Sequence, residues 1–317
     1  MTVLPRQLQR DAYGRPFLNF RISVTQRCNL RCTYCHREGQ LGSQREMTPS
    51  EISRIARVSA KLGGTKVKIT GGEPLLRNDL PEILEGICRI SEVEEISIVT
   101  NATLLGQDLA RQLKSNGLKR ININIPSVDP KTYERLTGGT LSEALAGVQA
   151  AKTAGLYPIK LNMLVLASEN DSQVASMIEF AKENQAILQI IELEPLQITS
   201  NYYRRYHFGL ESIEKKIAEK ASQVRVREHM QGRRIYSLPG VDVELVRPVE
   251  NTEFCLHCTR MRLTSDGNVK PCLMRNDDLT DLLTPLRLGA TDSELEKLLA
   301  NTVKQRRPFY AESSEPS

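Results

Sequence analysis

Three cysteines near the start of the chain, Cys28, Cys32 and Cys35, are spaced to do metal chemistry. Their C-x3-C-x2-C spacing lets one short loop direct all three thiolates at a single metal centre. Structural zinc takes four protein ligands, and a [4Fe–4S] cluster held by four cysteines is likewise closed. Three local ligands would leave one iron of such a cluster open to a substrate. The competing interpretation is a zinc knuckle completed by His36 or by a distant cysteine.

A second group of three cysteines, Cys255, Cys258 and Cys272, lies near the other end of the chain. Asp266-Gly267 between two short strands predicts a hairpin that returns Cys272 to the side of the other two. The remaining cysteine, Cys88, falls in the apolar phase of a helical pattern and is expected in the core. Metal ligation explains cysteines divided in this way better than disulfide bonds do.

Polar residues recur on one face of two predicted strands. Asn122 and Asn124 alternate with isoleucines, and Lys160 and Asn162 share a face in the same way. Because a fully buried parallel strand reads as a continuous apolar run, these faces predict a wet, functional barrel interior. The alternative is that loops cover and satisfy them.

Two arginines, Arg260 and Arg262, are spaced two apart on the strand that precedes the predicted hairpin. Both guanidinium groups would therefore face one side, next to the second cysteine group. Arginine forks match the oxygens of a phosphate in paired hydrogen bonds. A solvated hairpin face is the alternative.

The elements that would position these side chains follow an α/β pattern. Six apolar strands are predicted at residues 20–24, 66–69, 95–99, 120–125, 159–166 and 187–193. Amphipathic helices separate most of them, and the clearest begins at a capping box at 48–51 with proline at the first helical position. Strand and helix repeated in this way predict a parallel sheet with helices outside, curled towards a barrel.

After residue 200 the pattern changes to a smaller α+β region. We predict a helix at 212–221, strands at 224–227, 233–238 and 241–247, a last helix at 292–305 and a disordered polar tail at 311–317. We therefore expect one unit at 1–200 that carries the first cysteine group, and another at 201–317 that carries the second.

The composition describes an ordinary globular protein. Of the 317 residues, 40% are hydrophobic and 26% are charged, and the net charge is +5. No dense lysine and arginine run argues for nucleic acid, and the absence of tryptophan argues against a base-stacking platform. The sequence has neither an apolar signal segment nor a run near the roughly 20 residues of a membrane span. We expect a cytoplasmic protein without nucleic-acid or membrane partners.

The first cysteine loop, with Tyr34 before its third cysteine, resembles the cluster loop of radical S-adenosylmethionine enzymes (radical SAM enzymes). Gly-Gly-Glu-Pro at 71–74 follows the second predicted strand and resembles the methionine-binding loop of that superfamily. Its glycines allow the backbone to approach a ligand closely. The resemblance implies a partial (βα)6 TIM-like barrel of the radical SAM type.

More narrowly, the chain is similar to the GTP 3′,8-cyclase family, which acts first in molybdenum cofactor biosynthesis. The motifs at 11–16, 21–25 and 68–77 match, and the second cysteine group with its Arg-x-Arg is the most specific part. The terminal Gly-Gly of bacterial relatives is missing, and the ending at 304–310 resembles the archaeal branch.

The resemblance implies S-adenosylmethionine and two [4Fe–4S] clusters as cofactors. The first cluster would sit on Cys28, Cys32 and Cys35, and the second on Cys255, Cys258 and Cys272. Positions that match S-adenosylmethionine contacts are Tyr34, Gly72 and Asn124, and positions that match GTP contacts are Arg21, Lys68, Lys160, Arg260, Arg262 and the backbone of Met261. The implied reaction is radical cyclisation of GTP to (8S)-3′,8-cyclo-7,8-dihydroguanosine 5′-triphosphate, with the chemistry carried by the cofactors.

Four positions depart from the family pattern. Lys68 stands where many relatives have arginine, which keeps the charge and loses the bidentate fork. Asn124 replaces a serine, Val99 replaces a threonine, and Glu194 stands where some relatives use methionine. These departures concern the ligand contacts and leave the expected reaction class unchanged.

The resemblance also implies partners. They are GTP as substrate, a reductant protein and, downstream, a cyclic pyranopterin monophosphate synthase, with a homodimer among the arrangements left open. Two other functions compete with the cyclase. A radical SAM enzyme that modifies a peptide would share the first cysteine group, and a zinc-binding interaction protein would carry zinc without iron.

Overall fold

The computed structural model describes residues 8–43 and 45–310. Its first half alternates strands with helices. The strands are β1 (Asn19–Ser23), β2 (Lys66–Thr70), β3 (Glu95–Thr100), β4 (Arg120–Asn124), β5 (Ile159–Leu164) and β6 (Ile187–Ile191). All six predicted strands are confirmed, with ends shifted by at most two residues.

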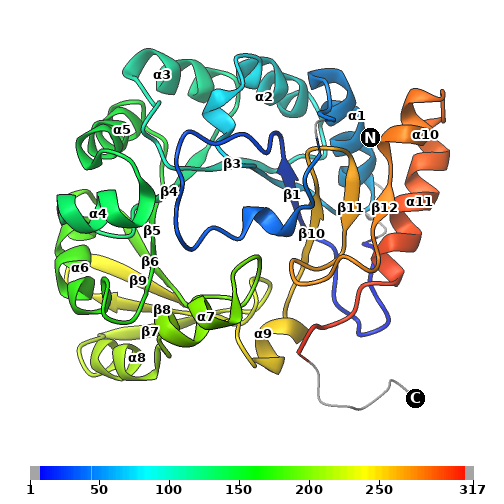
Figure 1. Cartoon of the computed structure of the whole chain (residues 1–317). Helices are drawn as coiled ribbons and strands as arrows, with labels where there is room; N and C mark the ends of the chain where they lie inside the picture. The colour runs from blue at the N-terminus through cyan, green and yellow to red at the C-terminus, as the bar shows by residue number, and fades with distance from the viewer. Residues whose placement is uncertain (1–7, 44, 311–317) are drawn as a thin grey trace.

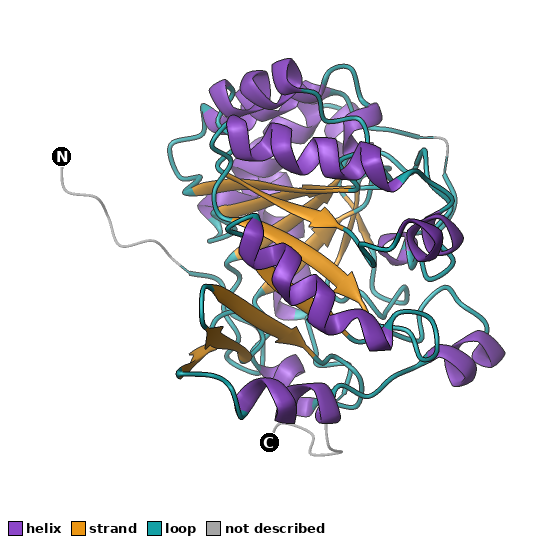
Figure 2. Cartoon of the chain, turned by 90° about the vertical axis from the view of Figure 1, so that its left-hand side faces the viewer, coloured by secondary structure: helices purple, strands orange, loops and turns teal. Residues whose placement is uncertain are grey.

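Helices connect these strands and cover the outside of the sheet (Figure 2). They are α1 (Pro49–Lys61), α2 (Leu80–Cys88), α3 (Gln107–Ser115), α4 (Pro130–Thr137), α5 (Leu141–Thr153) and α6 (Val174–Glu183), with short 3-10 turns η1 (Arg37–Gly39), η2 (Pro74–Leu76) and η3 (Asp171–Gln173). The predicted capping box starts α1: the Glu51 N–H donates to Thr48 Oγ1, and the Glu51 carboxylate accepts from the Thr48 N–H.

The second half adds short helices and strands. They are α7 (Ser200–Tyr206), α8 (Glu211–Ala218), β7 (Gln223–Arg227), β8 (Arg233–Leu238), β9 (Val241–Val246), α9 (Thr252–Leu256), β10 (Arg260–Leu263), β11 (Asn268–Lys270), β12 (Thr280–Asp281), α10 (Leu283–Arg287) and α11 (Asp292–Lys304). The predicted helices and strands of this region are present, and β10 and β11 form the predicted antiparallel hairpin. The tail predicted at 311–317 lies outside the described residues.

The described strands form one sheet in the order β12-β11-β10-β1-β2-β3-β4-β5-β6-β9-β8-β7. Strands β10 and β9 extend the β1–β6 ladder in parallel, one at each side. The outer strands β7, β8, β11 and β12 are antiparallel to their neighbours. The strands curve around a central space, with β7 and β12 as the free ends of the sheet (Figure 1). The result is an open, partial barrel.

Each parallel strand divides its side chains between two environments. The apolar set packs against the helices and is fully buried: Ile22, Ile69, Ile98, Ile123, Leu161 and Ile190. The set between them faces inward: Arg21, Lys68, Val99, Asn122, Lys160 and Gln189. The period-2 alternation that the sequence showed therefore puts an apolar layer outside the sheet and a polar layer inside it.

A buried ion triad ties the two ends of the chain together. Asp11 Oδ2 accepts from Arg15 Nε and from Arg306 Nε, each at 2.8 Å. Arg306 Nη2 also donates to the Arg15 carbonyl at 2.6 Å, and only 1% of the Arg306 side chain is exposed. The triad supports the second cysteine group, since Arg15 Nη1 donates to the Cys255 carbonyl at 2.8 Å.

We expect Asp11→Ala to lower the free energy of unfolding by about 3–5 kcal/mol, because two buried guanidinium groups would lose their carboxylate. Chemical denaturation followed by circular dichroism measures the change. The matched control is Asp108→Ala, which breaks an exposed pair with Arg111 and should cost less than about 1 kcal/mol. Equal stability losses in the two variants would contradict the structural role of the triad.

The expectation for Cys88 was wrong. This residue ends α2, and its thiol is exposed rather than in the core. The buried face of α2 consists of Leu80, Ile83, Leu84 and Ile87, and Cys88 is the last residue of the helix. In the described part of the chain, no helix is both long and apolar enough to cross a membrane.

Candidate active site

One cavity of about 310 Å³ lies inside the barrel, a size typical of small-molecule sites. All six cysteines of the two groups line it, although the groups stand at opposite ends of the sequence. The predicted polar strand residues line it as well: Arg21, Lys68, Asn122, Asn124, Lys160, Asn162, Arg260 and Arg262. The amides and arginines therefore face the cavity rather than a covering loop or open solvent.

The first cysteine group occupies the loop after β1. Cys28, Cys32 and Cys35 are free thiols. The Leu30 N–H donates to Cys28 Sγ at 3.5 Å, and the Arg37 N–H donates to Cys35 Sγ at 3.4 Å. Burial raises the pKa of Cys32 to about 12, and the two neighbouring thiols add to the shift. Local backbone turns thus hold the sulfurs at the cavity wall.

This donor set fits a [4Fe–4S] cluster. Each thiolate of such a cluster binds a separate iron, so its ligands stand further apart than those around one ion. Within residues 8–43 and 45–310, no three His, Cys, Asp or Glu side chains are spaced for a single ion. His36 is engaged otherwise, because its Nδ1 accepts from the Glu38 N–H at 3.0 Å. Three thiolates from one loop are the donor set that a [4Fe–4S] cluster with one open iron would take.

The Gly-Gly-Glu loop follows β2 and lies against the segment that leads into Cys28. The Gly72 N–H donates to the Thr25 carbonyl at 2.7 Å, and the Glu73 N–H donates to the Arg27 carbonyl at 2.8 Å. A Cβ at Gly72 would lie 2.2 Å from the Arg27 carbonyl oxygen. The glycine is therefore required by a close backbone approach.

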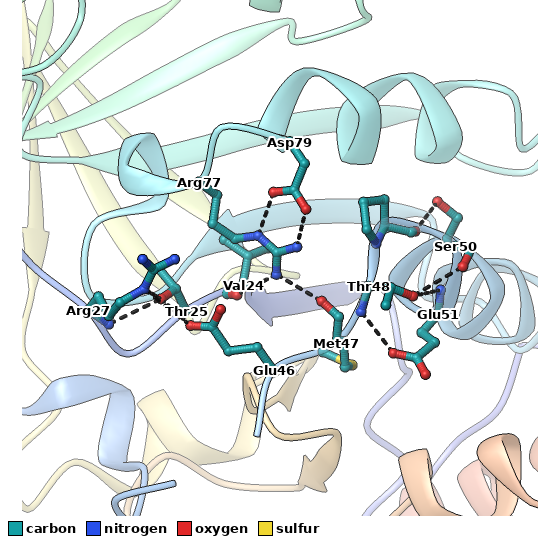
Figure 3. A network of polar contacts seen from close by, with 12 residues as sticks. Val24, Thr25, Arg27, Glu46, Met47, Thr48, Ser50, Glu51, Arg77 and Asp79 are labelled. Atoms are coloured by element: carbon teal, nitrogen blue, oxygen red, sulfur yellow. Dashed lines mark hydrogen bonds and ion pairs between the residues drawn. The ribbon is translucent and has the colours of Figure 1, made fainter. Parts of the chain in front are cut away.

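Arg77 supports the same segment from the side of the helices. Its Nη1 donates to the carbonyls of Val24 and Met47, at 2.9 and 2.8 Å. Asp79 pairs with the guanidinium group and fixes its orientation (Figure 3). Only 6% of the Arg77 side chain is exposed, so this support is rigid.

The second cysteine group is assembled by α9 and the β10–β11 hairpin. Cys255 belongs to α9, Cys258 follows that helix, and Cys272 follows β11. The hairpin returns Cys272 to the cavity that the other two line, as predicted. Burial raises the pKa of Cys272 to about 11.

Cations crowd the wall between the two cysteine groups. Arg21 on β1 is in register with Lys68 on one side and with Arg262 on the other. Burial lowers the pKa of Arg21 to about 10. Burial, together with the neighbouring cations, holds the pKa values of Lys68 and Arg260 well below their usual range. Such a set is costly to bury without an anion.

Glu38 connects the first cysteine loop to two of these cations. Its carboxylate accepts from Thr70 Oγ1 at 2.9 Å and from Arg262 Nη1 at 2.5 Å, and it lies 3.7 Å from Arg21 Nε. Burial opposes the ionisation of Glu38, but the two arginines outweigh burial and lower its pKa to about 2. The loop and the arginine-bearing strands are therefore held as one unit.

Two family models match the chain: the Radical SAM superfamily at residues 22–181 and Molybdenum Cofactor Synthesis C at residues 186–312. A protein of Pyrococcus horikoshii named "Probable GTP 3',8-cyclase" is 45% identical over 311 residues, which are 96% of this chain and 99% of that protein. A protein of Methanocaldococcus jannaschii with the same name is 43% identical over 95% of this chain and 99% of that protein. The chain belongs to the GTP 3′,8-cyclase family.

A solved structure supports the fold of this family member. Streptococcus suis SuiB bound to S-adenosylmethionine superposes with a TM-score of 0.64 at 17% identity, over 86% of this chain and 67% of that chain. As a radical SAM enzyme, the protein uses S-adenosylmethionine and an iron–sulfur cluster, and it is a cyclase of molybdenum cofactor biosynthesis. Membership therefore favours iron–sulfur over zinc in this protein.

The cavity brings together nearly all positions predicted for a GTP 3′,8-cyclase. Tyr34, Gly72 and Asn124 line it with the predicted cations, and so do the variant positions Val99 and Glu194. The Met261 side chain is fully buried in the core and does not line the cavity, and the predicted contact was with its backbone. Only its backbone is available for the predicted contact.

The sequence interpretation missed several charged residues of the family member's cavity. Arg120 continues the inward alternation of Asn122 and Asn124 on β4, so the same period-2 signal could have found it. Arg227 and Arg233 also line the cavity. They come from the antiparallel strands β7 and β8, whose register with the barrel had no signal in the sequence.

Proposed function

We propose that the protein converts GTP to (8S)-3′,8-cyclo-7,8-dihydroguanosine 5′-triphosphate by radical SAM chemistry. One observation carries this proposal: a single cavity is lined by both cysteine groups and by a band of buried cations. The names of the relatives at 41–45% identity support the same substrate.

Residues of the 1–200 unit would generate the radical. Cys28, Cys32 and Cys35 would hold the first [4Fe–4S] cluster, which supplies the electron that cleaves S-adenosylmethionine when it is bound. Tyr34, Gly72 and Asn124 would contact S-adenosylmethionine. The chain's own contribution is a rigid loop, a close backbone approach at Gly72 and a walled cavity that limits the access of water.

Residues of the 201–317 unit would complete the substrate site. Cys255, Cys258 and Cys272 would hold a second [4Fe–4S] cluster that faces the guanine. The residues proposed to contact GTP are Arg21, Lys68, Lys160, Arg260, Arg262 and the backbone of Met261. A triphosphate carries about four negative charges, and arginine forks bind its oxygens in pairs. The crowded, partly desolvated cations would be stabilised by such an anion.

The ribose must be oriented while the phosphates are held. Arg260 and Arg262 project from one face of β10 into the cavity that both cysteine groups line. Phosphates anchored at the lysines and arginines, with the guanine at the second cluster, would set the ribose between them. Fixing the reacting groups in this way supplies much of the rate enhancement in a radical cyclisation.

Anaerobic reconstitution followed by product analysis tests the proposal. Incubation with S-adenosylmethionine, a reductant and GTP should give GTP-dependent 5′-deoxyadenosine and the cyclised triphosphate, and the protein should bind about eight irons. A protein that forms no 5′-deoxyadenosine in response to GTP would contradict the cyclase, and response to a peptide instead would favour the peptide-modifying alternative. Stoichiometric zinc without iron would support the interaction protein.

A further inference from the structure

A second charged cluster lies at the cavity wall and is built from β5 and three strands of the second half of the chain, β7, β8 and β9. Glu244 is its centre and is fully buried. Its carboxylate accepts from Lys160 Nζ, from Arg227 Nη1 at 3.2 Å and from Arg233 Nη1 at 3.5 Å. Three cations thus share one carboxylate, which leaves an excess of positive charge facing the cavity.

Arg233 is the least satisfied member of this cluster. Its residue is 8% exposed, it lines the cavity, and its Nε has no hydrogen-bond partner among the described residues. Its Nη1 lies 3.5 Å from Glu244, Gln231 accepts from its Nη2, and Phe254 lies under its guanidinium group. The side chain is held at the cavity wall while its Nε–H has no acceptor, and a nearby anion would stabilise such an unpaired buried donor.

We propose that Arg233 is a further phosphate-binding residue of the substrate site, and that Glu244 is the positioning residue that holds Arg233 and Lys160 for the incoming anion. The inference rests on the proposed function, since it assigns these residues to the triphosphate of the same GTP. No other described carboxylate is hydrogen-bonded to Arg233.

Charge and geometry favour phosphate over a carboxylate or a sugar hydroxyl as the ligand. Arg227, Arg233 and Lys160 converge from three strands, so their donors can reach several oxygens of one polyphosphate. Planar guanidinium forks match phosphate oxygens in pairs. A neutral hydroxyl would leave the positive charge of the cluster uncompensated.

Glu244 also controls the charge of Lys160. Burial lowers the pKa of Lys160 to about 8, Glu244 opposes that shift, and Arg227 and Arg233 add to it. Among the described residues, these three are the strongest charged influences on Lys160, and Lys68 interacts with it as well. Without the carboxylate, Lys160 would lose its proton at lower pH, and an anion that needs the charged amine would bind less well as the pH rises.

Equilibrium binding of GTP, GDP and GMP to the anaerobically reconstituted enzyme tests the role of Arg233. Arg233→Gln should weaken GTP binding about 10–100-fold and leave GMP binding nearly unchanged, because only the outer phosphates lose a contact. The matched control is Arg234→Gln, the next residue on β8, whose side chain is 60% exposed and lies outside the cavity wall. It should bind all three nucleotides as the wild type does.

Several outcomes would overturn the assignment of Arg233. Unchanged GTP affinity in Arg233→Gln would do so, and an equal loss for GMP would place the residue elsewhere in the site. If that variant does not fold, Arg233→Lys keeps the charge without the fork, and it must still lose GTP affinity relative to GMP. Wild-type enzyme that binds no GTP would instead refute the proposed function, and with it the assignment of Arg233 that rests on that function.

The pH profile of GTP binding tests Glu244. In Glu244→Gln, affinity should fall at lower pH than in the wild type over the range of about pH 6.5 to 8.5. The matched control is Asp242→Asn, two residues earlier on β9, where the carboxylate pairs with the half-exposed Arg225 outside the cavity. Its profile should overlay that of the wild type. If the pH profile of Glu244→Gln also overlays that of the wild type, the positioning role is overturned. A loss of protein stability alone would not shift the pH profile of GTP binding.

Discussion

Replacing Cys272 with alanine is expected to leave S-adenosylmethionine cleavage intact and to abolish GTP cyclisation. Cys272 belongs to the β10–β11 hairpin, whereas the loop that carries the first cysteine group follows β1. The substitution therefore removes a ligand of the proposed second cluster without touching the loop that binds the first. The loss of product should exceed the roughly 10–100-fold effect of removing an outer-sphere partner of a metal site.

Two measurements on the Cys272→Ala enzyme separate these effects. Liquid chromatography of 5′-deoxyadenosine reports cleavage, and mass spectrometry of the nucleotide reports cyclisation. Bound iron should fall from about eight to about four per chain. The control is Cys88→Ala, an exposed thiol at the end of α2 and outside the cavity wall, which should keep both activities and all the iron. Full cyclase activity in Cys272→Ala would contradict the role given to the second cysteine group.

The barrel could be predicted because apolar and polar residues alternate along its strands and so identify the buried face and the inner face of each strand. Ile22, Ile69 and Ile98 mark the buried side, while Arg21 and Lys68 mark the inner side at the alternate positions. Period 2 is enough to separate the two faces of a strand. The cysteine spacing and the Asp266-Gly267 turn also predicted that each cysteine group comes together, since each group depends on a local stretch of chain.

The two acidic centres could not be predicted, because each depends on pairing between distant strands. Glu38 becomes a partner of Arg262 only when β10 pairs in parallel with β1. Glu244 meets Lys160 only because β9 adds to the ladder beyond β6. No local sequence pattern predicts that strands of the C-terminal region pair with both β1 and β6 and so extend the sheet on both sides.

Cys88 shows the limit of helical periodicity at a helix end. Its spacing after Ile83, Leu84 and Ile87 matches the buried stripe of α2. Ile87 is fully buried and its neighbour Cys88 is exposed, so helical spacing alone did not decide burial at this helix end.

The backbone around Gly72 leaves no room for a side chain. An added Cβ would lie 2.2 Å from the Arg27 carbonyl oxygen and 2.6 Å from the carbonyl carbon of that residue. The facing segment cannot move aside freely, because Arg77 binds the Val24 carbonyl and the Thr25 hydroxyl donates to Glu46 at 2.5 Å (Figure 3). Relief of the clash must therefore displace either the Gly-Gly-Glu loop or the start of the first cysteine loop.

We expect Gly72→Ala to reduce S-adenosylmethionine cleavage by about a hundredfold or more, since a displacement near 1 Å is enough to cost that much in a positioned site. Weaker binding of S-adenosylmethionine, measured by equilibrium dialysis, should accompany the loss. The control is Gly106→Ala, at the N-cap of α3, where an added Cβ meets nothing within 4 Å. That variant should keep wild-type cleavage and lose about 0.5–1 kcal/mol of stability, because alanine is a poorer N-cap than glycine. Normal cleavage in Gly72→Ala would show that the loop tolerates a side chain, and the assignment of Gly72 to the S-adenosylmethionine site would then lose its physical basis.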